Sequence, residues 1–144
     1  MFICNHCPYV NAINHKLVRD ARELASIGVG TVAIMSNNAE EYPEDSFANM
    51  CRVALEQNYP FPYLLDASQD TARAYGAVCT PDFFGYNAAL ELQYRGRMDE
   101  SGARRDAGSP RRDLFLAMKS VAETGRGPET QLPSIGCSIK WRND

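Results

Sequence analysis

Apolar and polar residues recur along this chain with the periods of helices and strands. Apolar residues three or four positions apart after Pro8 predict an amphipathic helix that runs to about Ile27 and ends at Gly28. The residues on its apolar face are Val10, Ile13, Leu17, Ala21 and Leu24. The β-rich apolar run at 29–35 then predicts a buried, parallel strand.

A second helix is predicted over 43–58, again with one apolar stripe that we expect to be buried. This stripe consists of Phe47, Met50, Cys51, Ala54 and Leu55. A short strand is predicted at 63–65. It is followed by a short helix at 68–75, which Gly76 ends.

The last part of the chain predicts a β-hairpin and one more helix. Segments 82–86 and 90–94 alternate apolar and polar residues on either side of a three-residue turn. Ser109 is a suitable N-cap with Pro110 at the first helical position, and Gly125 follows the last apolar position of that helix. The expected helix therefore begins at Pro110.

This order of elements predicts an α/β protein whose sheet is covered by helices on both faces. The 144 residues are enough for a single domain, which we assign to residues 1–144, with a Pro- and Gly-containing tail at about 126–144. A net charge of −3 gives no electrostatic reason to expect nucleic acid or an anionic membrane as a partner. Five cysteines are an odd number, which favours free thiols in a reducing compartment and predicts a cytoplasmic protein.

The motif Cys4-Asn5-His6-Cys7 carries the most specific chemistry. Two cysteines separated by two residues, after a short apolar run and before a helix, are typical of a thiol–disulfide redox site. We expect Cys4 to be the nucleophile and the more exposed and more acidic thiol, because a helix N-terminus stabilises a thiolate. Cys7 is then the resolving thiol, and His6 beside it favours the thiolate and so the reduced form.

The chain also resembles the thioredoxin fold in its redoxin form, which has an extra helix after the second strand. In particular it is similar to bacterial thioredoxin-like proteins labelled as redoxins or as similar to alkyl-hydroperoxide-reductase-type peroxiredoxins. The motifs that carry this resemblance are Cys4-Asn5-His6-Cys7-Pro8-Tyr9-Val10, Tyr42-Pro43-Glu44-Asp45, Pro60-Phe61-Pro62-Tyr63, Cys79-Thr80-Pro81-Asp82-Phe83-Phe84, Tyr94-Arg95-Gly96-Arg97 and Gly136-Cys137-Ser138-Ile139-Lys140-Trp141. Members of this group carry a longer segment before the C-x-x-C. The resemblance therefore implies that the chain lacks this N-terminal segment, including the strand that supplies a buried carboxylate in many thioredoxins.

The resemblance also implies that the Thr80–Pro81 bond is cis and that its loop faces the C-x-x-C. The backbone before Pro81 would then be free to pair with an extended substrate segment. Cys79 lies two residues before Pro81 and is either a third redox thiol or a small packing residue. The implied function is a thiol–disulfide oxidoreductase that acts on protein or small-molecule disulfides, with no cofactor and no metal.

Two other functions remain open from the sequence. In a peroxiredoxin-like peroxidase Cys4 would attack a hydroperoxide, but Met1 stands where those enzymes carry Thr. In a metal-binding module, Cys4, Cys7 and a histidine would hold copper, since soft thiolates suit Cu(I). For Cys51 we expect a buried core thiol, and for Cys137 a structural role in the tail or a return to the site.

Overall fold

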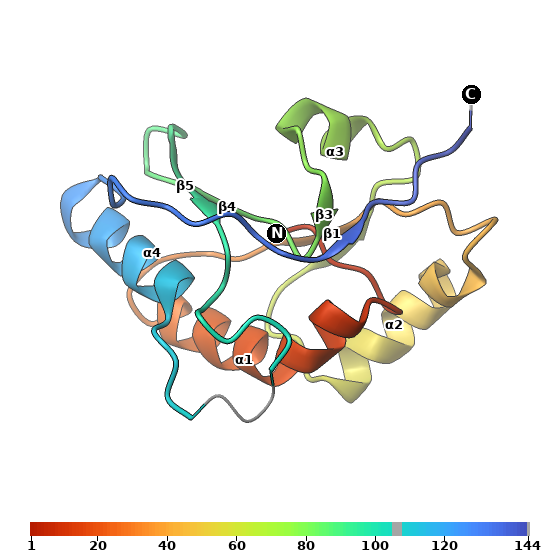
Figure 1. The fold of residues 1–144 in the computed structure, drawn as a ribbon, viewed down its shortest axis with the longest axis horizontal. Helices are drawn as coiled ribbons and strands as arrows, with labels where there is room; N and C mark the ends of the chain where they lie inside the picture. The colour runs from red at the N-terminus through yellow and green to blue at the C-terminus, as the bar shows by residue number, and fades with distance from the viewer. Residues whose placement is uncertain (105–107, 144) are drawn as a thin grey trace.

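The computed structural model describes residues 1–104 and 108–143. The elements in chain order are α1 (Pro8–Ala25), β1 (Ala33–Met35), the 3-10 helix η1 (Pro43–Asp45), α2 (Phe47–Glu56), β2 (Tyr63–Leu65), α3 (Asp70–Tyr75), β3 (Cys79–Thr80), β4 (Phe83–Tyr86), β5 (Leu92–Gly96), α4 (Asp113–Thr124) and β6 (Cys137–Ser138). In Figure 1, α1, α2 and α4 lie on one side of the strands, and α3 lies on the other side with the C-terminal segment. This is the predicted thioredoxin-like architecture, with α2 as the extra helix after β1.

The strands form three pairs, and isolated β-bridges at Phe2 connect two of these pairs. β1 pairs with β2 in parallel, whereas β4 pairs with β5 and β3 pairs with β6 in antiparallel fashion. Phe2 forms bridges to Ile34 on one side and to Asp82 on the other. The apolar run before the C-x-x-C motif thus forms isolated bridges at Phe2, which join the two halves of a mixed sheet.

Helix α1 forms as the apolar periodicity predicted. Its five predicted core residues are all at most 6 % exposed. They fill one face of a helix that packs against the sheet and against α4. Pro8 occupies the first helical position, where its missing N–H costs nothing. The helix ends at Ala25, two residues before the predicted end.

The prediction of a buried stripe on α2 is wrong. Met50 is buried, but Phe47 is 58 % exposed, Leu55 is 79 % exposed and Cys51 is exposed as well. The helix is amphipathic, yet in the described part of the chain only the turn around Met50 packs against the core. Cys51 is therefore not the buried core thiol that its place on the stripe predicted.

The start of α4 also differs from the prediction. The helix begins at Asp113, three residues after Pro110, although Gly125 ends it in the left-handed conformation as expected. The backbone before α4 bonds to the loop that follows β5, through Glu100 N–H to the Arg111 carbonyl and Leu114 N–H to the Met98 carbonyl. These tertiary bonds hold the segment in an extended form and override the local capping signal.

Candidate functional site

The two cysteines of the C-x-x-C motif lie where α1 meets the loop after β3. Cys7 is the N-cap residue of α1, and its Sγ donates a hydrogen bond to the Thr80 carbonyl at 3.1 Å. The Cys4 Sγ lies 3.4 Å from the Thr80 Oγ1. Both are free thiols and both are buried, with 2 % of Cys4 and 0 % of Cys7 exposed. Cys4 is thus the more exposed of the two, as predicted, but only slightly, because the Thr80 loop covers the motif.

The two thiols influence each other's ionisation. The interaction with Cys4 lowers the pKa of Cys7, against the effect of burial, and the backbone of Cys137 and Val10 acts in the same direction. That same interaction raises the pKa of Cys4 well above its ordinary value, and burial adds to the rise. Cys7 and not Cys4 is the N-cap residue, so the helix N-terminus acts most directly on the Cys7 sulfur.

His6 contacts a buried carboxylate and an aromatic ring. Its Nδ1 lies 2.7 Å from Oδ2 of Asp45, and its ring stacks on Tyr42 with the planes 4° apart. Asp45 is 0 % exposed, and it accepts hydrogen bonds from the Asn5 backbone at 2.7 Å and the Asn37 side chain at 2.8 Å. The carboxylate thus fixes both the imidazole and the backbone between the two cysteines.

Asp45 is a site residue that the sequence reasoning missed. The carboxylate expected from thioredoxins belongs to a strand before the motif, and Asp45 instead comes from η1 after β1. The motif Tyr42-Pro43-Glu44-Asp45 was the available signal, since it already carried the family resemblance. The sequence could not indicate that Asp45 contacts Asn5, because the two residues are 40 positions apart.

The residues able to hold a metal are Cys4, His6 and Asp45, whose ligand atoms lie within 4.8 Å of one another. The carboxylate oxygens, however, already accept bonds from Asn5 and Asn37, and the His6 Nδ1 faces Asp45 rather than open space. A metal here would have to displace these partners. The donor set thus fits a carboxylate–imidazole–thiol site better than a coordination sphere.

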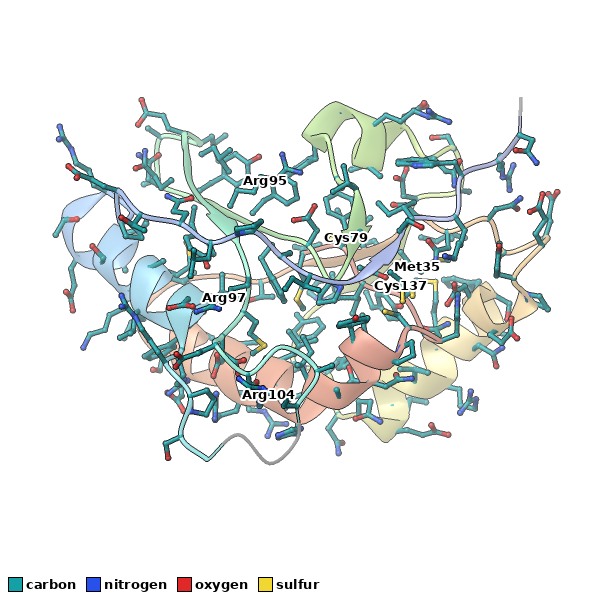
Figure 2. All side chains as sticks on the ribbon, viewed as in Figure 1. Met35, Cys79, Arg95, Arg97, Arg104 and Cys137 are labelled. Carbon is teal, nitrogen blue, oxygen red and sulfur yellow. The ribbon has the colours of Figure 1, made fainter. Side chains whose placement is uncertain are left out.

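The Thr80–Pro81 peptide bond is cis, and its loop lies directly against both thiols. The backbone before Pro81 is not free, however. Thr80 pairs with Cys137 of β6, so the C-terminal segment of the chain occupies the edge that was expected to receive a substrate strand. Figure 2 shows Cys137 where this segment crosses the middle of the molecule. The tail is thus part of the site.

The other two thiols have distinct surroundings. Cys79 is buried, and its Sγ points to the Pro81 carbonyl at 3.5 Å. Burial raises the pKa of the Cys79 thiol to about 11, and the Asp82 charge contributes to the rise. A neutral thiol in this position packs the loop. Cys51 is an exposed free thiol on α2.

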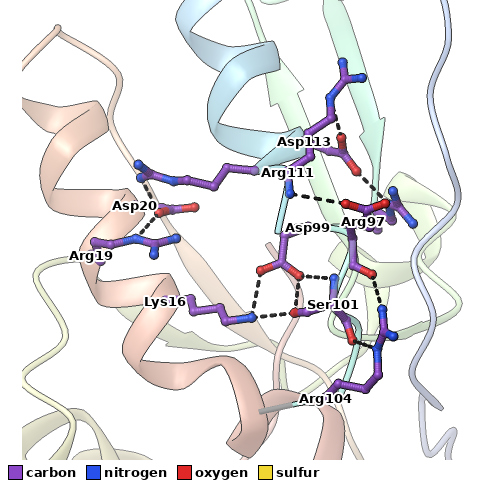
Figure 3. A network of polar contacts seen from close by, with 11 residues as sticks. Lys16, Arg19, Asp20, Arg97, Asp99, Ser101, Arg104, Arg111 and Asp113 are labelled. Carbon is purple, nitrogen blue, oxygen red and sulfur yellow. Dashed lines mark hydrogen bonds and ion pairs between the residues drawn. The ribbon is translucent and has the colours of Figure 1, made fainter. Parts of the chain in front are cut away.

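A cavity of about 250 Å³ opens beside the motif, and Pro81 and Tyr9 line it together with Ile13 and Phe83. A buried polar cluster forms part of its wall, in which the Lys16 ammonium bonds to Asp99 at 2.9 Å and to Ser101 (Figure 3). The cavity therefore has an apolar lining, and Pro81 of the loop that covers the thiols forms part of this lining.

The two arginines of the Tyr94-Arg95-Gly96-Arg97 motif are held by other groups. Arg95 bonds to the Gly76 carbonyl and to Asp82, and Arg97 pairs with Asp113 at 2.6 Å. Neither makes a described contact with Cys4.

Comparison with known proteins agrees with this architecture. The model of the family described as AhpC/TSA family matches residues 1–116. The chain is 50 % identical to an uncharacterized conserved protein from Geobacillus kaustophilus, with a TM-score of 0.94, over 100 % of this chain and 76 % of that one. It is 41 % identical to a hypothetical protein from Sinorhizobium meliloti 1021, with a TM-score of 0.91, over 99 % and 78 % of the two chains. No curated protein matches the chain.

Proposed function

Because the chain belongs to the AhpC/TSA family of thiol-based redox proteins, we propose that Cys4 and Cys7 form the dithiol/disulfide site of a thiol–disulfide oxidoreductase. The observation that carries the proposal is the contact of both sulfurs with Thr80, at 3.4 Å from Cys4 and 3.1 Å from Cys7. Two thiols that contact the same residue are positioned to form a disulfide with each other. A peroxidase needs only one such thiol.

The reaction uses the two thiols in sequence. Cys4 attacks one sulfur of a substrate disulfide as a thiolate, after its proton has passed to the neighbouring His6–Asp45 pair, and the S–S bond of the substrate breaks. Cys7 then attacks the Cys4 sulfur of the mixed disulfide and releases the second substrate thiol. The two protons of the dithiol end on the reduced substrate, and the protein is left with a Cys4–Cys7 disulfide.

Neighbouring groups support these steps in the proposal. His6 and Asp45 lie within 4.8 Å of the Cys4 sulfur and are able to move a proton to or from it. Thr80 offers its hydroxyl to Cys4 and its carbonyl to Cys7, and Pro81 forms a wall of the adjoining cavity. That cavity accommodates a small-molecule disulfide or one side chain of a protein disulfide.

The second candidate is a thiol peroxidase, which the family also favours. In that reaction the Cys4 thiolate attacks a hydroperoxide oxygen and becomes a sulfenic acid, and Cys7 condenses with it to a disulfide and water. In the described residues no hydrogen bond joins an arginine to the Cys4 sulfur, and Arg95 and Arg97 are paired with Asp82 and Asp113 instead. We rank this reaction second for that reason. The copper-binding alternative ranks below it because the donors near Cys4 are already bonded to one another.

The test measures both reactions on one set of proteins. Wild type is expected to reduce a protein disulfide such as insulin with dithiothreitol as electron source, and Cys4→Ser and Cys7→Ser are each expected to abolish this. Cys51→Ser is the matched control, because Cys51 is exposed and lies outside the site. If hydrogen peroxide is consumed by wild type and Cys7→Ser alike while insulin is not reduced, the protein is a peroxidase and the first proposal fails.

A further inference from the structure

The C-terminal segment is anchored beside the thiols by several contacts. Ile139 is 3 % exposed, and its N–H bonds to the Val78 carbonyl at 3.2 Å. The Lys140 carbonyl accepts the Asn38 N–H at 2.8 Å, and the Lys140 N–H donates to the Asn37 side chain at 2.9 Å. Because these bonds hold both edges of the segment, its position next to β3 is a fixed feature of the fold.

Gly136 allows the segment to approach the Thr80 loop closely. A Cβ atom at this position would lie 2.1 Å from the Thr80 oxygen and 3.0 Å from the Pro81 nitrogen, and both are backbone atoms. No backbone atom can give way by rotating a side chain, so only glycine fits here. The next residue, Cys137, is thereby placed directly opposite Thr80 in the β3–β6 pair.

This register brings a third sulfur to the site. Thr80 accepts the Cys7 thiol on its carbonyl and pairs with Cys137 across the strands, so Cys7 and Cys137 meet at the same residue. Cys137 packs against the core cluster that contains Cys4 and Cys7. The backbone and the side chain of Cys137 both help to lower the pKa of the Cys7 thiol, which agrees with this placement. Cys79 also lies in β3, but its sulfur points to the Pro81 carbonyl instead.

We propose that Cys137 is a third redox thiol, which takes over the disulfide from the C-x-x-C motif. The Cys137 thiolate attacks the Cys7 sulfur of the Cys4–Cys7 disulfide, the bond to Cys4 breaks, and a Cys7–Cys137 disulfide forms. Cys4 leaves as a thiolate and takes up the proton that Cys137 lost. The step involves no net oxidation, and its starting disulfide comes from the proposed function, on which this inference rests.

The exchange divides the two motif cysteines between two partners. Cys4 has its Sγ beside the Thr80 hydroxyl and serves the external disulfide, whereas Cys7 is fully buried under β6 and serves the internal one. After the exchange Cys4 is again a free thiol while the oxidising equivalent is held on the C-terminal strand. The class of reaction that must follow is reduction of this Cys7–Cys137 disulfide by a dithiol.

The decisive experiment uses two single variants of the full chain. Each is treated with oxidised glutathione, alkylated and digested with trypsin, which leaves Cys4 and Cys7 on the peptide ending at Lys16 and Cys137 on the peptide ending at Lys140. Cys4→Ser is expected to give the Cys7–Cys137 cross-linked peptide pair as the main oxidised product. Cys7→Ser is expected to give at least tenfold less of any cross-link to Cys137. A Cys4→Ser protein that carries only glutathione on Cys7 would overturn the proposal.

A second pair of variants tests the role of the strand. Gly136→Ala, made in the Cys4→Ser protein, is expected to lower the yield of the cross-link about tenfold or more because the added methyl displaces the segment. Gly30→Ala is the matched control, since a Cβ there meets nothing within 4 Å. An unchanged yield in folded Gly136→Ala contradicts the proposal. If Gly136→Ala does not fold, the comparison of Cys4→Ser with Cys7→Ser still decides.

The same digest separates this inference from the proposed function. A wild-type protein that reduces insulin and forms only the internal Cys4–Cys7 disulfide refutes the role of Cys137 and leaves the oxidoreductase intact. A protein that forms the Cys7–Cys137 link in the Cys4→Ser variant but reduces no disulfide refutes the proposed function instead.

Discussion

Replacing Asp45 by Asn is expected to destabilise the reduced protein by about 2–4 kcal/mol. The carboxylate is 0 % exposed and accepts hydrogen bonds from Asn5 N–H and the Asn37 amide. An Asn side chain keeps one acceptor for Asn5 but turns its own NH₂ toward Asn37 and His6. The lost bond from Asn37 is to a charged acceptor and contributes about 1.5–3 kcal/mol. The pair with His6, whose side chain is 27 % exposed, contributes up to about 1 kcal/mol.

The assay is equilibrium denaturation in urea with dithiothreitol present, so that no disulfide contributes. The same loss can be read from thermal unfolding. A chain of this size loses about 3 °C in melting temperature per kcal/mol, so the melting temperature of Asp45→Asn is expected to be about 6–12 °C below that of wild type. Glu44→Gln is the matched control, because Glu44 is the adjacent carboxylate and is exposed, and its effect is expected to stay within about 0.5 kcal/mol. A loss below 1 kcal/mol for Asp45→Asn would refute the reasoning, since it would mean that the buried carboxylate is not needed to hold the motif.

Two further predictions concern parts of the fold outside the site. Burial alone would raise the pKa of Asp66, but hydrogen bonds from the Ala72 amide and the Ser36 hydroxyl hold it below its ordinary value. A lowered pKa contributes stability that is present above the unfolded value of about 3.9 and is lost as the pH falls through the folded value. The stability gap between wild type and Asp66→Asn is therefore expected to be full at pH 7 and to shrink below pH 4, and a gap that grows in acid would contradict the assignment. On α2, Met50→Ala is expected to lower the free energy of unfolding, measured in urea, by about 2–4 kcal/mol, because Met50 is 1 % exposed. Leu55→Ala is expected to lower it by less than about 0.5 kcal/mol, because Leu55 is 79 % exposed. Equal losses would show that another element covers the apolar stripe of α2.

The sequence predicted the elements that local patterns determine. The apolar face of α1, the strand that follows it, the hairpin and the glycine ends of α3 and α4 all depend on residues close together in the chain. The C-x-x-C at the start of α1 belongs to the same class, because a strand-to-helix junction and two cysteines are visible within a few positions.

The sequence could not show what packs against a helix or what returns to a site. Amphipathicity on α2 is real, but whether another element covers Phe47 and Leu55 depends on the tertiary structure. Asp45 and Cys137 are far from the motif in sequence and come close to it only in the folded chain. In particular, no local pattern indicated that Cys137 lies opposite Thr80 in a pair of strands.

The bonds that assemble the motif are among the longest in sequence, and this has a consequence for how the chain folds. The contacts of Cys4 and Cys7 with Thr80 span 76 and 73 residues, so they close late compared with the local turns of α1. Until that closure, both sulfurs are ordinary thiols in a flexible segment and Cys51 competes with them as an equal partner. Refolding under oxidising conditions is therefore expected to trap scrambled species, whereas refolding in a reductant, followed by oxidation, lets the native geometry select the disulfide.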